Sequence, residues 1–540
     1  MLERLIENWL DSAGERTYQR CFCQMLIGRG YRIIHNTEHT PLEHGKDIIA
    51  ISPEGKLVGF QLKGNPGKTL KPSEFRVIRG QLDQLATLAL GLPGYEKEIL
   101  DECCLVTNGE VDEAVSIQIQ QLNNSLEVRG FGQERIKTIT RGTMLAWAND
   151  LGLALWPSEM QDFGNLVKLL NYEGNEIFPA RVLDPLLQNT LRLQHDVPAP
   201  ELRRRITSAA IMTAIALHSF SRKQNHFAEI TAWMMFAAYT IAACEKNGLD
   251  FKKDAEEAVL AARDAIYGLL GELCEELRDR STLAEGDPFS EFAFYRPRAL
   301  LIYALMAIYW KWSEAEGWKH PDHKPLIEAL IPEQLPPSIW GEAAVPLYIT
   351  YIWYRKWMIP ARELDMRIAQ MLHEIMRNKL SEQAVHLPSP YYDIEDVTRR
   401  DYQKDLGVEN PFSGDSFAGG SYVCESLLML LVRAGMKDEC KALWPDFTRM
   451  THEQTIPDHA WRFGLYRMGD NATDEMKIYP RTMEWKDLQC LMAENAGTEV
   501  PQAMKCDPIL LLLFVNVFPF RASFSALKFL HSKFDTPVAS

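Results

Sequence analysis

The chain has 540 residues, which is too long for one hydrophobic core, so we expect two to four domains. A hydrophobic fraction of 46% and a charged fraction of 24% are ordinary for a soluble globular protein. The net charge of −15 argues against a general nucleic-acid coat protein, but an enzyme that acts on nucleic acid needs only a local basic face.

The cysteines and the apolar runs bear on the cellular compartment. No pair of cysteine pairs has the spacing of a zinc site, so we expect buried, reduced thiols. The first residues lack the basic and apolar regions of a signal peptide. The charge-free runs Pro508–Phe520 and Ala232–Cys244 are short for a bilayer span and predict buried helices. The sequence therefore predicts a cytoplasmic protein without a membrane segment.

The first 155 residues alternate between helical and strand-like patterns. Apolar residues at helical spacing predict a helix from Glu15 to Arg29, which the glycines Gly28 and Gly30 end. The later elements, in chain order, are strands at 31–34, 48–51 and 57–62, a helix at 72–90, a strand at 102–107, a helix at 110–122, a strand at 136–140 and a helix at 142–150. This order predicts an α/β domain with a mixed sheet flanked by helices.

The predicted hairpin of residues 45–64 gathers three polar side chains on one face. A turn centred on Glu54 places Asp47 opposite Gln61, and Lys63 follows two residues later on the same face. A bulge at the turn would shift this register by one residue. A carboxylate, an amide oxygen and an ammonium can together hold a divalent cation and organise a water against a phosphodiester.

Three motifs of this domain occur in a definite order. They are Glu15 with Tyr18 followed by Gly30-Tyr31, then Gly45-Lys46-Asp47-Ile48-Ile49 followed by Gln61-Leu62-Lys63, then Leu105-Val106-Thr107-Asn108-Gly109 before a helix that contains Ala114. Together they resemble the restriction-endonuclease-like PD-(D/E)xK nucleases, and among them the Mrr-like branch. The resemblance covers roughly residues 10–150.

The resemblance implies an endonuclease that cleaves DNA, with RNA less expected, and that requires Mg²⁺, for which Mn²⁺ could substitute. Asp47, Gln61 and Glu15 would be its metal ligands, with the carbonyl of Leu62 as a further oxygen. These three residues and Lys63 would be the catalytic set, in which Lys63 orients or deprotonates the attacking water. Gln61 stands where Asp or Glu is commoner, but the Mrr-like branch accepts Gln there.

Glu15 and Asp47 also have simpler interpretations. An acidic residue in the first turn of a helix is favoured by the helix dipole, which would explain Glu15 without a metal. Glu38 or Glu43 would then complete the site. An Asp at the start of a strand is often only a turn or cap residue.

A local excess of basic residues follows the hairpin. Residues 63–79 contain five basic residues and one acid, Glu74. We expect Lys68, Lys71, Arg76 and Arg79 to contact the phosphate backbone of DNA, the alternative being a solvated helix face. No helix-turn-helix or zinc finger is evident, so sequence-specific binding is not predicted.

The remainder of the chain reads as a large all-α region without strand-like alternation. Predicted helices cover 201–221, 226–245, 254–278, 297–316, 344–357, 361–378, 421–434 and 508–517. A proline-rich break at 387–412 suggests a division, so we predict a nuclease-like domain at 1–155 and helical domains at 156–385 and 386–540. We expect the helical region to regulate the nuclease, to assemble it as a homo-oligomer or to sense an activating protein partner.

Two features of the helical region have alternative interpretations. The aromatic residues between Tyr303 and Trp357 form either a surface for stacking or docking, or a helical core with aromatic residues at helix ends. The loop Gly414-Asp415-Ser416 to Ser421 offers either Ser416 as a nucleophile or Ser421 as a helix cap, and its helical setting favours the cap.

The sequence as a whole predicts a metal-dependent endodeoxyribonuclease that serves in a bacterial restriction or anti-phage system. That cellular context is fold-level analogy. The alternative is a catalytically inactive nuclease fold that acts as a binding module for proteins or nucleic acid on a helical scaffold.

Overall fold

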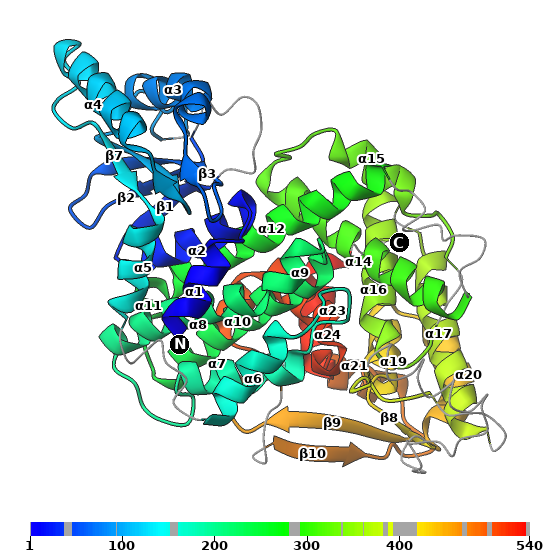
Figure 1. Cartoon of the computed structure of the whole chain (residues 1–540). Helices are drawn as coiled ribbons and strands as arrows, with labels where there is room; N and C mark the ends of the chain where they lie inside the picture. The colour runs from blue at the N-terminus through cyan, green and yellow to red at the C-terminus, as the bar shows by residue number, and fades with distance from the viewer. Residues whose placement is uncertain are drawn as a thin grey trace. The chain divides into compact units, whose positions relative to one another are not determined.

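The computed structural model describes residues 2–36, 46–92, 94–151, 160–279, 292–335, 339–359, 361–381, 387–392, 418–466, 472–493 and 499–535. The chain forms two compact units, Met1–Leu269 and Leu270–Ser540 (Figure 1). Glu38, Glu43 and Ser416, which the sequence offers as alternative site residues, lie outside the described residues. The domain boundaries at residues 155 and 385 stay predictions.

The first unit contains the predicted mixed sheet. Its five strands are ordered β1-β2-β3-β5-β7, and the first three pair antiparallel while β3, β5 and β7 run parallel. Their bounds are β1 (Arg32–Asn36), β2 (Ile48–Ile51), β3 (Leu57–Lys63), β5 (Glu102–Thr107) and β7 (Ile136–Ile139). Ile48 pairs with Phe60, so the predicted hairpin register is confirmed and places Asp47 opposite Gln61.

One predicted helix of this domain begins later than expected. Residues Glu110–Val111 form a short strand, β6, which pairs in parallel with β4 (Thr69–Leu70). The side chain of Asp112 then accepts a hydrogen bond from the backbone N–H of Ala114 and caps α4. Asp112 is a residue type that commonly caps helices. The strands β4 and β6 have two residues each, which is too short to show the alternation that predicts a strand.

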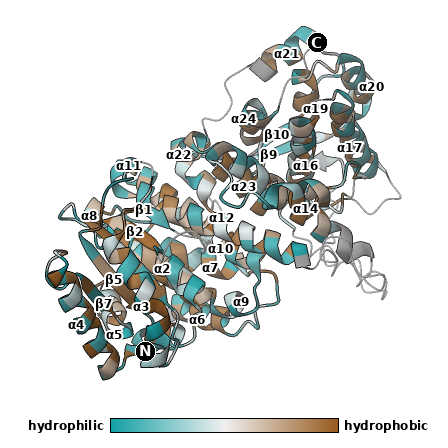
Figure 2. Cartoon of the chain, turned by 90° about the horizontal axis from the view of Figure 1, so that it is seen from above, coloured by the Kyte–Doolittle hydropathy of each residue, from teal (hydrophilic) through white to brown (hydrophobic). Residues whose placement is uncertain are grey.

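The helices of the first unit lie on both faces of the sheet and continue beyond it. Their bounds are α1 (Leu2–Leu10), α2 (Glu15–Gly28), α3 (Pro72–Thr87), α4 (Glu113–Val128), α5 (Arg141–Asn149), α6 (Met160–Leu170), α7 (Ala180–Thr190), α8 (Ala199–Ala216), α9 (His218–Arg222), α10 (His226–Lys246), α11 (Phe251–Asp254) and α12 (Glu256–Asp279), which from Leu270 on belongs to the second unit. Phe75 of α3 and Val115 of α4 pack with Ile49 and Leu105 of the sheet in one core. Figure 2 shows the mixed hydrophilic and hydrophobic residues around α4 that this one-sided packing requires.

Helix α2 covers the other face of the sheet and is itself covered by helices of the same unit. Every residue from Tyr18 to Leu26 except Arg20 is buried. Phe22 meets Phe60 of β3 edge-to-face, with ring centroids 5.7 Å apart. On its far side Arg20 makes a 2.8 Å ion pair with Glu229 of α10. The helix is therefore an interior element shared by the sheet and the helical segment that follows.

The approach of α2 to α8 and α12 is close. The amide of Gln24 donates a 2.8 Å hydrogen bond to the carbonyl of Ala258 in α12. A Cβ atom on Gly28 would lie 2.1 Å from Oγ1 of Thr207 in α8, so a larger residue would have to displace the Thr207 side chain. Thr207 therefore packs directly on the backbone of α2 at Gly28.

Helix α10 is long and apolar enough to cross a membrane by length and composition, and among the described residues it is the one helix that passes this test. Within the unit, 94% of its apolar window is buried, as in the core helix of a globular protein.

The second unit is mostly helical. Its α-helices are α14 (Phe292–Glu316), α15 (His323–Leu330), α16 (Ala344–Met358), α17 (Glu363–Leu380), α19 (Cys424–Arg433), α20 (Lys437–Phe447), α21 (Trp485–Ala493), α22 (Gln502–Cys506), α23 (Pro508–Val517) and α24 (Phe524–Phe534). The short 3₁₀ helices are η3 (Ala460–Gly464) and η4 (Pro519–Arg521). Trp312, Trp353 and Tyr354 are fully buried, which agrees with the core interpretation of the aromatic residues.

The prediction of an all-α region is wrong in its last part, because a three-stranded sheet ordered β10-β9-β8 lies there. Its strands are β8 (Gly420–Ser421), β9 (Thr451–Pro457) and β10 (Ala472–Lys477). The buried positions of β9 include His452 and Gln454, and the Gln454 amide donates a 2.6 Å hydrogen bond to Glu425. Since polar residues occupy these inward positions, the strand lacks the apolar alternation that would have revealed it.

The contact of Gly28 with Thr207 yields the first prediction. We expect Gly28→Ala to destabilise the first unit by about 1–3 kcal/mol, because the added methyl group must displace α8. Thermal and urea unfolding measure the change. The matched control is Gly80→Ala in α3, where nothing lies within 4 Å of an added Cβ. This control should be neutral or stabilising by about 0.5–1 kcal/mol. Equal stabilities of the two variants would contradict the tight packing of α2 on α8.

Candidate functional site

Asp47 and Gln61 meet where β2 begins and β3 ends. The amide Nε2 of Gln61 donates a 2.7 Å hydrogen bond to Oδ2 of Asp47, and the backbone N–H of Leu62 donates to the same oxygen at 2.6 Å. Both side chains are 6% exposed. The antiparallel register brings the pair together, as the sequence predicted. The other polar atom of the amide, Oε1 of Gln61, is buried and has no hydrogen-bond partner in the described structure.

Glu15 reaches the same end of β3 from the first turn of α2. Its Oε2 accepts a 2.7 Å hydrogen bond from the backbone N–H of Gly64. A Cβ on Gly64 would lie 3.1 Å from the Cβ of Glu15, so the loop backbone is pressed against the start of the helix. Glu15 is half-buried and bonds to the backbone of Gly64. An acidic residue that only interacts with the helix dipole would need neither feature.

Tyr18 lies one turn further along α2 and joins these groups. Its hydroxyl donates to the carbonyl of Val106 at 3.3 Å and accepts from the backbone N–H of Lys63 at 3.1 Å. Burial, above all, and the negative charges of Glu15 and Asp47 raise the pKa of this phenol well above its usual range. The Tyr18 hydroxyl therefore stays protonated near neutral pH, where it holds the backbone of β3 in place and does not act as a base.

Lys63 ends β3 beside these residues and is half-buried. Strand alternation puts it on the face that carries Gln61, two residues before it. Within the described part of the chain Lys63 forms no ion pair, so its ammonium is available to a ligand. The structure thus brings Asp47 and Gln61 into contact, and it places Glu15 and Lys63 at the same strand end.

A buried asparagine that sequence reasoning did not select organises the loop after Lys63. The side chain of Asn108, fully buried, accepts from the backbone N–H of Asn65 at 2.8 Å. Its Nδ2 donates to the carbonyls of Leu10 and Ala13, each at 2.8 Å. The sequence signal is the Asn108-Gly109 pair, which ends the third motif of the resemblance but is not among the predicted site residues.

The donor set is chemically suited to a hard divalent cation. Carboxylate and amide oxygens are the ligands that Mg²⁺ and Mn²⁺ prefer, and Glu15, Asp47 and Gln61 supply them. The buried Oε1 of Gln61 lacks a donor, a situation that costs free energy unless a partner is present. Rotation of the amide by half a turn would turn Oε1 towards Asp47, and a cation between the two acceptor oxygens would offset their repulsion. The residues therefore fit a metal.

The four basic residues expected to contact phosphate are all exposed. Lys71 forms a 3.1 Å ion pair with Asp112, so part of its charge is compensated. Among the described residues, neither Arg76 nor Arg79 of α3 forms an ion pair. These two arginines are the better candidates for contact with an anionic polymer.

The second unit contains another group of side chains that could hold a metal: the potential ligand atoms of Glu275, Asp322 and His323 lie within 4.8 Å of one another. The guanidinium of Arg278 binds Asp322 and lies 3.1 Å from Glu275. His323 lies 2.5 Å from Glu275 and 3.0 Å from the hydroxyl of Tyr309. An arginine already compensates the two carboxylates, so this is an ion-pair network more than a cation site.

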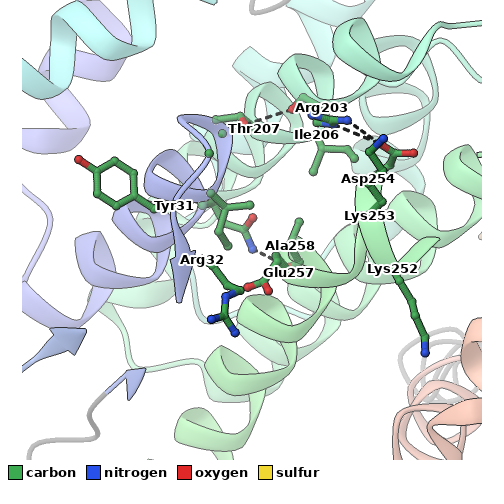
Figure 3. Close-up of a pocket in the computed structure, with 15 residues that line it drawn as sticks. Tyr31, Arg32, Arg203, Ile206, Thr207, Lys252, Lys253, Asp254, Glu257 and Ala258 are labelled. Carbon is green, nitrogen blue, oxygen red and sulfur yellow. Dashed lines mark hydrogen bonds and ion pairs between the residues drawn. The ribbon is translucent and has the colours of Figure 1, made fainter. Parts of the chain in front are cut away.

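The first unit contains a cavity of about 330 Å³ between the C-terminal half of α2, the start of β1, α8 and the α11–α12 segment (Figure 3). Arg203 and Asp254 on its wall form a 2.8 Å ion pair. Burial raises the pKa of Glu257 at the same cavity, and the charge of Arg32 opposes that rise. Lys252 and Lys253 also line the cavity, so its charged side chains are mostly basic.

At the glycine-rich loop, Ser421 bonds to the start of α19 as the sequence indicated, although the N-cap position itself is Val423. The hydroxyl of Ser421 accepts hydrogen bonds from the backbone N–H groups of Val423 and Cys424 at the start of α19. It also donates a 2.6 Å hydrogen bond to Glu342, which is fully buried and whose pKa burial raises. Ser421 is thus held in a structural network.

Comparison of the chain with protein-family models, with curated proteins and with solved structures found no match.

The contact between Asp47 and Gln61 yields a prediction about cation affinity. In Gln61→Glu a second carboxylate adjoins Asp47, so we expect Mn²⁺ to bind on the order of tenfold more tightly. Without a cation the like charges should lower the unfolding temperature. Calorimetric titration and thermal unfolding with Mn²⁺ or EDTA measure both effects. Gln81→Glu, which adds the same charge at an exposed position of α3, is the control and should show neither. An unchanged affinity in Gln61→Glu would mean that no cation binds at this pair.

Proposed function

We propose that the first unit is a metal-dependent endonuclease of the PD-(D/E)xK type, similar to the Mrr-like branch, and that it cleaves DNA. The observation that carries the proposal is the contact between Asp47 and Gln61, together with the unpartnered Oε1 of that amide. Glu15 and Lys63 at the same strand end supply the other groups that phosphodiester hydrolysis needs. The mixed sheet with flanking helices is compatible with a restriction-endonuclease-like fold.

Asp47, Gln61 and Glu15 would hold Mg²⁺ or Mn²⁺. The bound ion lowers the pKa of a water and polarises the phosphoryl oxygen. Lys63 orients or deprotonates the attacking water and offsets the charge that develops on the phosphate. The Tyr18 hydroxyl binds the backbone N–H of Lys63, which fixes the position from which the Lys63 side chain extends.

The helical parts of the chain regulate the nuclease, assemble it or sense a partner. The packing of α2 against α8, α10 and α12 supports such coupling, because α2 carries Glu15 and Tyr18. A homo-oligomer would place two sites on opposite DNA strands, and an activating protein partner would supply the trigger. A cytoplasmic role in bacterial restriction or anti-phage defence fits this arrangement by fold-level analogy.

A second candidate function is a catalytically inactive binding module on a helical scaffold. One observation favours it: Oδ2 of Asp47 already accepts two hydrogen bonds, from Leu62 and Gln61. A carboxylate satisfied in this way can serve structure alone. The two functions differ in what the loss of Lys63 does, which the next experiment measures.

We expect Asp47→Ala to abolish plasmid cleavage with Mg²⁺ or Mn²⁺ and to remove Mn²⁺ binding. Lys63→Ala should lower the cleavage rate by about a thousandfold while Mn²⁺ binding persists, since the lysine acts on water and phosphate. The control is Lys56→Ala at the opposite end of β3, where the ammonium pairs with Glu102. Wild-type protein that never cleaves DNA or RNA, alone or with candidate partner proteins, and that binds no Mn²⁺, would favour the binding module.

The exposed arginines of α3 generate a prediction about DNA affinity. Arg76→Ala with Arg79→Ala should weaken binding to a DNA duplex and reduce the slope of log K against log salt by about two, because each lost phosphate contact removes about one released counterion. Fluorescence anisotropy in EDTA, at several salt concentrations, measures the slope without cleavage. Lys97→Ala, also exposed, is the control. A slope equal to that of the wild type would show that the face is merely solvated.

A further inference from the structure

Asn108 lies at the end of β5, beside the candidate site but outside the proposed ligand set. Thr107 before it pairs with Lys63 in the parallel ladder. The three hydrogen bonds of the Asn108 amide all go to backbone groups: Oδ1 accepts from the N–H of Asn65, and Nδ2 donates to the carbonyls of Leu10 and Ala13. Asn108 is fully buried, so its side chain does not contact solvent.

The two segments that Asn108 joins are the two that carry the site. Leu10 and Ala13 form the corner between α1 and α2, immediately before Glu15. Asn65 follows Gly64, whose N–H binds Glu15. The hydrogen bonds of Asn108 and the contact of Glu15 with Gly64 are therefore two parallel links between the same pair of segments.

The next residue shows how closely these segments approach. A Cβ on Gly109 would lie 2.2 Å from the carbonyl oxygen of Lys68 and 2.5 Å from that of Asn65. The turn after β5 is thus pressed against the loop after Lys63, and a side chain could enter only if that loop moved. The loop is thus contacted by Asn108 and Gly109 after β5 and, at Gly64, by Glu15 of α2.

We propose that Asn108 is a positioning residue of the proposed metal site: it fixes the α1–α2 corner against the Asn65 loop and thereby holds Glu15 at the end of β3. The inference rests on the proposed function. If Glu15 turns from Gly64 towards a cation, the contact between Glu15 and Gly64 is lost and the link through Asn108 keeps the two segments together. The effect of Asn108 on cation affinity must then pass through Glu15.

A double-mutant cycle on Mn²⁺ affinity tests this route. Asn108→Asp keeps the acceptor for Asn65 and removes the donors to Leu10 and Ala13. We expect Mn²⁺ to bind about tenfold more weakly to Asn108→Asp, the size usual for residues that support ligands. The added negative charge alone would act in the opposite direction. In a Glu15→Ala background the same change should alter affinity by no more than about twofold while still lowering the unfolding temperature.

The matched control is Asn123→Asp. Asn123 bridges the N–H and the carbonyl of Ile136 with bonds of 2.8 and 2.9 Å, and Ile136 pairs with Cys103 at the end of β5 remote from Thr107. This change should lower the unfolding temperature and leave Mn²⁺ affinity as it was. If Asn108→Asp does not fold, Asn108→Ser takes its place, since a hydroxyl can replace only part of the three bonds.

The outcomes separate the inference from the proposed function. Mn²⁺ binding that survives in Asp47→Ala means that the proposed site is wrong. Mn²⁺ binding that is lost in Asp47→Ala but unchanged in the folded Asn108 variants overturns the role of Asn108 and leaves the site. An effect of Asn108→Asp that is equally large with and without Glu15 also overturns it, because Asn108 would then act by another path.

Discussion

The burial of α2 on both sides is the constraint on which the first unit depends. A helix that covers a sheet in an α/β domain usually keeps one face in water, and its outward residues are polar. Here Gln24 and Arg20 face outward, yet both bind helices that follow the sheet domain, and Gly28 allows α8 to touch the backbone. The helical segment of this unit is consequently part of the support of the sheet, and the fold of the first 155 residues cannot be considered without it.

The same helix also fixes the backbone at the end of β3. Its first residues, Glu15 and Tyr18, bind the backbone of Gly64 and Lys63, and these bonds are made in a poorly solvated place. Hydrogen bonds in such a place are strong when all partners are present and costly when one is missing. The buried Oε1 of Gln61, like the Oε1 of Gln24 in α2, is an exception, because neither has a hydrogen-bond partner among the described residues. An exception of this kind deserves a chemical explanation, and a ligand is the explanation that also accounts for the carboxylates around it.

Much of the sheet domain could be predicted from the sequence, because its strands follow simple patterns. Ile48–Ile51 and Leu57–Leu62 are apolar runs that flank the turn Pro53-Glu54-Gly55, so the register and the pairing of Asp47 with Gln61 followed directly. The bonds of Asn108 could not be predicted, because they join residues nearly a hundred positions apart through backbone groups that every residue possesses. The strand β9 could not be predicted for a related reason, because its inward residue Gln454 is polar and bonds to Glu425, which lies 29 positions away.

Gln61 has a consequence for how such a site could be controlled. A second carboxylate beside the nearly buried Asp47 would bind a cation more tightly, but it would leave two like charges in contact whenever the cation was absent. The neutral amide removes that repulsion and donates to Asp47 instead, so the sheet end is stable without metal. The cost is weaker cation binding, which the charge of a phosphate group can offset when substrate is present. Under the proposed function, the cation and the nucleic acid would favour each other's binding, and a shift of Glu15 would act on both.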